Sequence, residues 1–198
     1  MLNRMIDEIG KCMESECFVA AMALALTLPD ICGKAEFPDK TPTKRYLDWY
    51  KEYVEPWERP SSPYGDDMPF PSAEMIYQLR NMLLHQGSVE TDTGRINDER
   101  CKVDEFNLVI TDEIDTGISR VSYGKELIPV SRGIEINIKR MCHVLCRRAK
   151  EYYSNNHSKF GFMRCNIKDE REKLHGAKDN VIKKVNNEFK PWQEKMQE

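Results

Sequence analysis

The stretch Phe18–Leu28 reads FVAAMALALTL and indicates the fold class. It is apolar on every side of a helical wheel, so we expect a helix buried inside a bundle. Apolar residues from Leu2 to Ile9 recur at helical spacing, which predicts that one long helix covers residues 2–28. We expect Pro29 to end or kink this helix, because proline lacks the N–H that the helix interior needs.

Further helices follow along the chain, each after a residue that can accept a hydrogen bond from the first turn. The sequence predicts them at 42–57 after Thr41, at 72–88 after Ser72 and at 132–155 after Ser131. The first carries an aromatic stripe that we expect to lie in the core, although a platform for base stacking is the alternative. Its members are Tyr46, Trp49, Tyr50, Tyr53 and Trp57.

The segment FNLVITDEI, which starts at Phe106, alternates apolar and polar residues as a half-buried strand does. A second strand is predicted within 118–130, so we expect a β-hairpin at about 105–130. The predicted fold is mainly α: a helical bundle of residues 1–160 with this small inserted hairpin. Residues 161–198 are highly polar and are predicted to form a C-terminal helical appendage.

Composition restricts the class of protein. The chain has 198 residues, of which 40% are hydrophobic and 32% charged, as in a globular protein. No apolar run reaches the roughly 20 residues that span a bilayer, so we expect no membrane segment. The net charge is −3, but residues 131–198 hold 16 Lys and Arg against 9 Asp and Glu. This basic third can bind a polyanion, or its charges can simply lie on solvated helix faces.

The seven cysteines are scattered and odd in number, which favours a reducing compartment, with the cytoplasm as the expected location. Cys12, Cys17 and Cys32 are expected to be small core residues. Cys142 and Cys146 are also assigned to the core, because zinc normally needs four ligands. We therefore predict no metal and no cofactor, and no nucleotide-binding or zinc-peptidase motif occurs.

The candidate reactive residues lie together in the stretch LRNMLLHQG, Leu79–Gly87. On an α-helix the polar side carries Glu74, Gln78, Asn81, His85 and Ser88, and Asn81 and His85 are neighbours on it. Arg80 lies about 140° from His85. Arginine holds phosphate oxygens through a fork of N–H groups, and histidine can take or give a proton near neutral pH. RNA cleavage by its own 2′-hydroxyl needs both functions and needs no metal.

Asp30 follows the buried helix and has two interpretations. It can begin a turn after Pro29, which is the interpretation we favour from the sequence. Alternatively, it can face the motif from a neighbouring helix and pair with Arg80 or raise the pKa of His85.

The motif RNMLLH, Arg80–His85, resembles the R-x(4–6)-H motif of the HEPN superfamily (higher eukaryotes and prokaryotes nucleotide-binding). The family commonly has Asn, Asp or His after the arginine, and here this residue is Asn81. The resemblance covers about residues 1–90 and 131–155, and it implies an antiparallel helical bundle. It also implies that Arg80 stabilises phosphate, that His85 transfers a proton and that Asn81 supports them.

Three classes of function remain open. The resemblance implies a metal-independent endoribonuclease, a homodimer that acts on RNA as a toxin or antiviral defence effector, with an antitoxin or other protein partner. The second class is a non-catalytic HEPN-like module that binds nucleic acid or a protein. The third is a structural protein with a chance motif, which predicts Arg80 buried in an intramolecular salt bridge and His85 far from any cleft.

Overall fold

The computed structural model describes residues 1–59, 69–86, 96–112, 117–123 and 129–164. Of residues 85–86, 117–123 and 129–132 it describes the backbone alone. Contacts divide the chain into the units Met1–Met163 and Arg164–Glu198. Most of the expected C-terminal appendage, residues 165–198, therefore lies outside the described residues.

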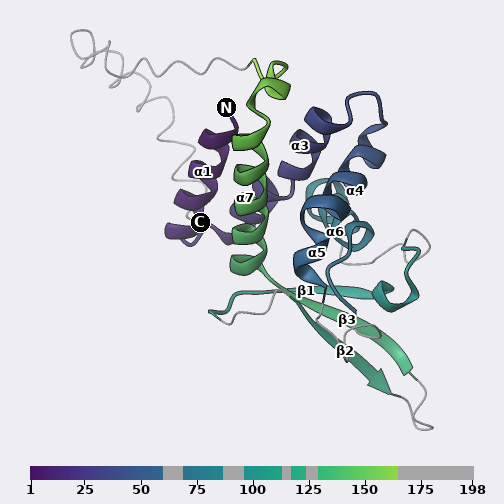
Figure 1. Cartoon of the computed structure of the whole chain (residues 1–198). Coiled ribbons are helices and arrows are strands. Elements are labelled where there is room, and N and C mark those ends of the chain that lie inside the picture. Colours follow the sequence, from purple (N-terminus) through teal and green to yellow (C-terminus); the bar gives the residue numbers. More distant parts are fainter. Residues whose placement is uncertain (60–68, 87–95, 113–116, 124–128, 165–198) are drawn as a thin grey trace. The chain divides into compact units, whose positions relative to one another are not determined.

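The described part is mainly helical with a small sheet, as the sequence predicts (Figure 1). The helices are α1 (Leu2–Glu14), α2 (Phe18–Ala25), α3 (Leu28–Glu36), α4 (Pro42–Tyr53), α5 (Glu55–Glu58), α6 (Ala73–Asn81) and α7 (Ile138–Asn155). Short helical turns of other types are η2 (Met82–Gln86), η4 (Glu99–Cys101) and η5 (His157–Phe160). The strands are β1 (Glu105–Val109), β2 (Gly117–Tyr123) and β3 (Pro129–Asn137).

The predicted long first helix is wrong, because the chain makes three helices over this stretch. It leaves α1 through Glu16, whose φ of 58° is unusual for a residue other than glycine. It breaks again after Ala25, and Pro29 lies in the first turn of α3 instead of ending a helix. Proline is tolerated in a first turn, where its missing N–H would have no partner in the helix.

One helical stretch among the described residues, Phe18–Glu36, is long and apolar enough to cross a membrane, and half of it is buried within the protein. It consists of α2 and α3, and its residues Ala21, Met22 and Leu28 belong to the core. Core helices pass the same test of length and composition, so the stretch is weak evidence for a membrane span.

Helix α7 is the element around which the bundle is arranged, and Figure 1 shows α1 and α3 on either side of it. It packs against α1, α2 and α3, while α4 packs against α3 and α6. The aromatic stripe of α4 is largely core, as predicted: Tyr46, Trp49 and Tyr50 are fully buried. Trp57 is a correction, because it lies in α5 and is 64% exposed.

The hairpin predicted at about 105–130 is wrong in its pairing. The sheet order is β1-β3-β2, in which β1 pairs with β3 in parallel and β2 pairs with β3 antiparallel. Residues 132–137 are therefore strand, and α7 begins at Ile138 under an Asn137 cap instead of a Ser131 cap. The sequence prediction extended the helix back to 132 because Ile134 and Ile138 are four residues apart, which fits one face of a helix. Ile134 and buried Ile136 are also two residues apart, which fits one face of a strand.

Candidate functional site

Helix α6 brings Arg80 to the candidate site. Ser72 caps this helix, because its side chain accepts a hydrogen bond from the Met75 backbone N–H, as predicted. Ile76 and Leu79 are buried against the core and fix the orientation of the helix. Arg80 therefore lies in the last turn of α6, which continues into η2.

Asp30 and Asn81 hold the Arg80 side chain. Its Nη2 donates to Asp30 Oδ2 at 2.7 Å, and its Nη1 donates to Asn81 Oδ1 at 3.0 Å. Asp30 lies in the first turn of α3, so the interpretation favoured from the sequence, a turn, is wrong. The alternative, a pair with Arg80 across neighbouring helices, is confirmed.

The exposure of the Arg80 and Asp30 side chains bears on whether their ion pair is purely structural or can also take part in binding. The side chains of Arg80 and Asp30 are 19% and 20% exposed, so the pair is neither on the open surface nor fully enclosed. The salt bridge that a purely structural role predicts is present, but solvent still reaches the guanidinium. A charged group that is held in place and partly exposed can still meet an anion from solution.

Two tyrosines line the same region and are not apparent from the motif. The Arg80 guanidinium lies 5.8 Å from the centre of the Tyr77 ring, and the Tyr77 hydroxyl shares a 2.8 Å hydrogen bond with the Thr43 hydroxyl. The Tyr46 ring lies 5.0 Å from Tyr77, and its buried hydroxyl has no hydrogen-bond partner among the described residues. Burial, and then the nearby Asp30 carboxylate, raise the pKa of Tyr46.

The backbone changes the angular relation between Arg80 and His85. After Asn81 the helix continues as the π-helical turn η2, Met82–Gln86. Its hydrogen bonds run from residue i to residue i+5, so residues five apart approach one another along the helix. The separation of about 140° expected from the sequence assumes an α-helix throughout residues 80–85, and the structure does not have one there. The His85 side chain lies outside the described residues.

The predicted polar face of α6 is only partly correct. Asn81 is partly exposed, as expected, but Gln78 is 6% exposed and packs inside. Glu74 pairs with Lys51 of α4 at 2.5 Å. The side of α6 opposite Ile76 thus meets α4 at Glu74, is buried at Gln78 and is partly exposed at Asn81.

The cysteines carry no metal site within the described ranges, where no group of three or more His, Cys, Asp or Glu could hold an ion. Burial raises the pKa of the Cys142 thiol to about 12 and that of Cys146 to about 11, which disfavours the thiolate that a metal binds. Cys32 is buried as expected, but Cys17 is exposed, because it lies where the chain leaves α1.

No family model matches this chain, and no curated protein or solved structure is significantly similar to it.

Proposed function

We propose that this protein is a metal-independent endoribonuclease of the HEPN type, with Arg80, Asn81 and His85 as its reactive residues. The observation that carries the proposal is the Arg80 guanidinium. It is held by Asp30 and Asn81 at the end of α6, is 19% exposed, and is followed by a wide helical turn that contains His85. An oriented cation and, five residues along the chain, a titratable imidazole are the groups that cleavage of an RNA phosphodiester needs.

In the proposed reaction, the 2′-oxygen of one nucleotide attacks phosphorus and the bond from phosphorus to the 5′-oxygen breaks. The 2′-hydroxyl gives up its proton and the leaving 5′-oxygen gains one, with His85 serving one of these transfers. Arg80 stabilises the charge that gathers on the phosphate oxygens. The products are a 2′,3′-cyclic phosphate and a 5′-hydroxyl.

From the resemblance to the HEPN superfamily we also propose an oligomeric state and a biological role. Two copies would place their Arg80–His85 motifs around one composite cleft, so the active form would be a homodimer. The protein would act in the cytoplasm as a toxin or a defence effector, controlled by an antitoxin or another protein partner. Light scattering of the purified chain tests the dimer directly.

The experiment is RNA cleavage in excess EDTA, with single-stranded and structured substrates. Arg80→Ala and His85→Ala are compared with the matched surface variants Arg4→Ala and His157→Ala, each checked for folding by circular dichroism. We expect cleavage by the wild type and both surface variants, 2′,3′-cyclic phosphate ends, and no cleavage of the same sequence as DNA. Cleavage that persists in Arg80→Ala and His85→Ala would contradict the proposal.

A second candidate function is favoured by the Asp30–Arg80 ion pair itself. A carboxylate 2.7 Å from the guanidinium reduces the charge offered to phosphate, as in a module that binds without cleaving. A wild type that binds RNA or a protein but leaves varied RNAs intact from pH 5 to 9 would establish this non-catalytic HEPN-like module in place of the nuclease.

A further inference from the structure

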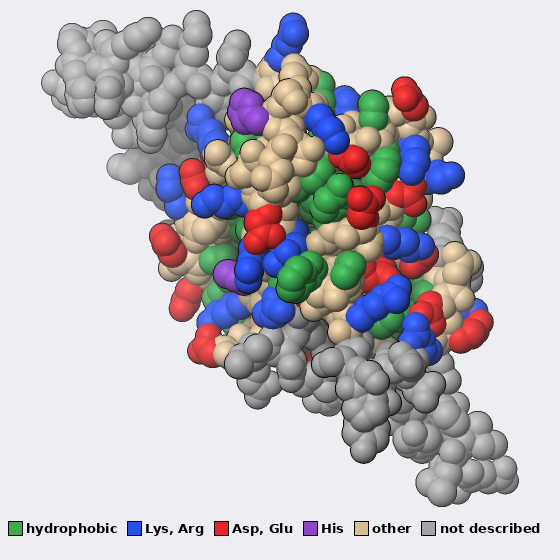
Figure 2. Space-filling model, viewed as in Figure 1, with side chains coloured by type: hydrophobic (Ala, Val, Ile, Leu, Met, Phe, Trp, Pro, Cys, Tyr) green, Lys and Arg blue, Asp and Glu red, His purple; other side chains and the backbone are tan. Residues whose placement is uncertain are grey.

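Helix α7 presents a stripe of cations along its solvent side. Its 18 residues include five Lys and Arg and a single acidic residue, Glu151. The stripe consists of Lys139, Arg140, His143, Arg147 and Lys150. These positions follow the helical repeat on the side opposite the buried Met141, Leu145 and Ala149. Figure 2 shows Lys and Arg side chains on the same face as α7, interspersed with Asp and Glu.

Acidic neighbours neutralise only part of this charge. Lys139 pairs with Asp112 at 2.6 Å, and Arg147 pairs with Glu151 at 3.1 Å. Arg140 lies 3.7 Å from Glu58 of α5. Counting these three acids against the four Lys and Arg of the stripe leaves a net charge of +1.

An exposed tryptophan flanks the stripe. Trp57 of α5 is 64% exposed, and its ring lies 4.2 Å from the Arg148 guanidinium of α7. Arg148 in turn pairs with Glu151 at 2.8 Å, which fixes the guanidinium against the ring. A large aromatic side chain left exposed beside cations is a typical stacking platform for a nucleic acid base.

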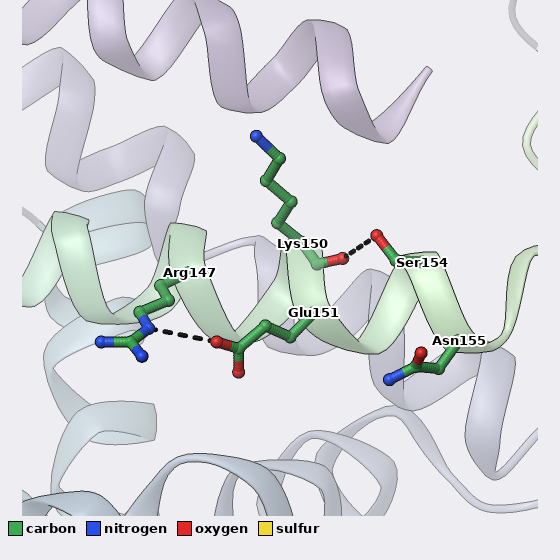
Figure 3. Close-up of a pocket in the computed structure, with 5 residues that line it drawn as sticks. All are labelled: Arg147, Lys150, Glu151, Ser154 and Asn155. Carbon is green, nitrogen blue, oxygen red and sulfur yellow. Dashed lines mark hydrogen bonds and ion pairs between the residues drawn. The ribbon is translucent and has the colours of Figure 1, made fainter.

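A hollow of about 400 Å³ lies along the last turns of α7. Its lining residues are Arg147, Lys150, Glu151, Ser154 and Asn155 (Figure 3). Arg147 and Glu151 meet along the helix, while the Lys150 ammonium extends away from them. The Ser154 hydroxyl already donates to the Lys150 backbone carbonyl at 2.9 Å, so the hollow offers phosphate the Lys150 ammonium and the Asn155 amide.

We infer that this α7 surface, with Trp57 at its side, binds single-stranded RNA through its phosphates and one stacked base. The charge selects a polyanion, and the exposed ring selects a base-bearing polyanion over a lipid surface or an acidic protein. The inference rests on the proposed function only for the choice of RNA. It assigns a binding surface on α5 and α7, elements that carry none of the proposed reactive residues.

The test is fluorescence anisotropy of a labelled 2′-O-methyl RNA 12-mer, which cannot be cleaved because its 2′-oxygen carries no proton. Binding is therefore measured whether or not the protein is a nuclease, so the two proposals can fail separately. Arg147→Gln/Lys150→Gln is compared with Arg4→Gln/Lys11→Gln on α1, which makes the same change of charge on another helix. Trp57→Ala is compared with Trp57→Phe, which keeps an aromatic ring.

We expect the α7 double variant to bind about tenfold more weakly and to reduce the slope of log affinity against log salt by about 1.4. Trp57→Ala should weaken binding at least about fivefold, and Trp57→Phe should retain most of it. Equal losses in the α1 and α7 double variants would overturn the assignment in favour of diffuse charge. Binding to phosphatidylserine vesicles without binding to the 12-mer would overturn it in favour of a membrane.

Discussion

Asp30 Oδ2 accepts a 2.7 Å hydrogen bond from Arg80 Nη2, although 50 residues separate them in the sequence. The pair joins α3 to α6 and orients the guanidinium of the candidate site. The coupling energy between its two charges should exceed that of a surface pair, because both side chains are about four-fifths buried and less screened by water.

We predict that a double-mutant cycle of Asp30→Ala and Arg80→Ala gives a coupling energy of about 1–2 kcal/mol in urea unfolding. The matched control is Arg4 and Glu8 of α1, whose side chains are 49% and 46% exposed. That pair should couple by less than about 0.5 kcal/mol. A coupling energy for Asp30 and Arg80 no larger than that of the control would contradict the structural role of the pair.

Helix capping offers a second comparison. The Ser72 hydroxyl accepts from Met75 N–H at the start of α6, whereas Thr41 occupies the same position in α4 without a side-chain hydrogen bond. We predict that Ser72→Ala costs about 1 kcal/mol of unfolding free energy and that Thr41→Ala costs much less. Thermal melts of the two variants check this, and an equal loss in both would refute the assigned cap.

Gly33 allows α3 to approach α4 closely. A Cβ at this position would lie 2.4 Å from the Arg45 carbonyl oxygen, a backbone atom that cannot rotate away. We predict that Gly33→Ala destabilises the protein by about 1–3 kcal/mol. At Gly10 in α1 an added Cβ meets no atom within 4 Å, so Gly10→Ala should stabilise by about 0.5–1 kcal/mol. Chemical denaturation distinguishes these opposite signs.

Glu36 should make stability depend on acid pH. Hydrogen bonds from Lys159 and then Tyr152 lower the pKa of this carboxyl below its ordinary value. A lowered pKa in the folded state contributes stability that is complete above the unfolded pKa, roughly 4.3, and is lost as pH falls through the folded pKa.

We therefore predict that Glu36→Gln is less stable than the wild type at pH 7 and that the difference shrinks progressively below about pH 4.3. Lys159→Met should weaken this pH dependence, because Lys159 is the largest cause of the lowered pKa. Urea midpoints between pH 3 and pH 7 provide the measurement. A difference that stays constant over that range would show that Glu36 does not carry the effect.

The mainly helical class could be predicted from the sequence, because buried helices leave a local apolar pattern. Residues such as Ala21, Met22 and Leu28 occupy the core for that reason. Ser72 was recognisable as a cap because capping needs only residues three positions apart. The same local signals placed Arg80 in the middle of a helix at 72–88, whereas the structure ends α6 at Asn81 and continues as η2.

The sheet could not be predicted in the same way. Ile134, Ile136 and Ile138 fit both a strand and a helix start, and the partner of β3 decides between them. Phe106 of β1 pairs with Ile134, and Leu108 pairs with Ile136, so the apolar residues of both strands share one face. Such pairing joins residues distant in the sequence and leaves no local trace.

By itself, then, the sequence determined the helical class, the α6 cap and the candidate motif, since each depends on residues within a few positions of one another. Only the tertiary structure decided that Asp30 meets Arg80, that Trp57 is exposed beside Arg148, and that β3 lies between β1 and β2. These relations depend on how helices and strands pack, and packing is set by the whole core.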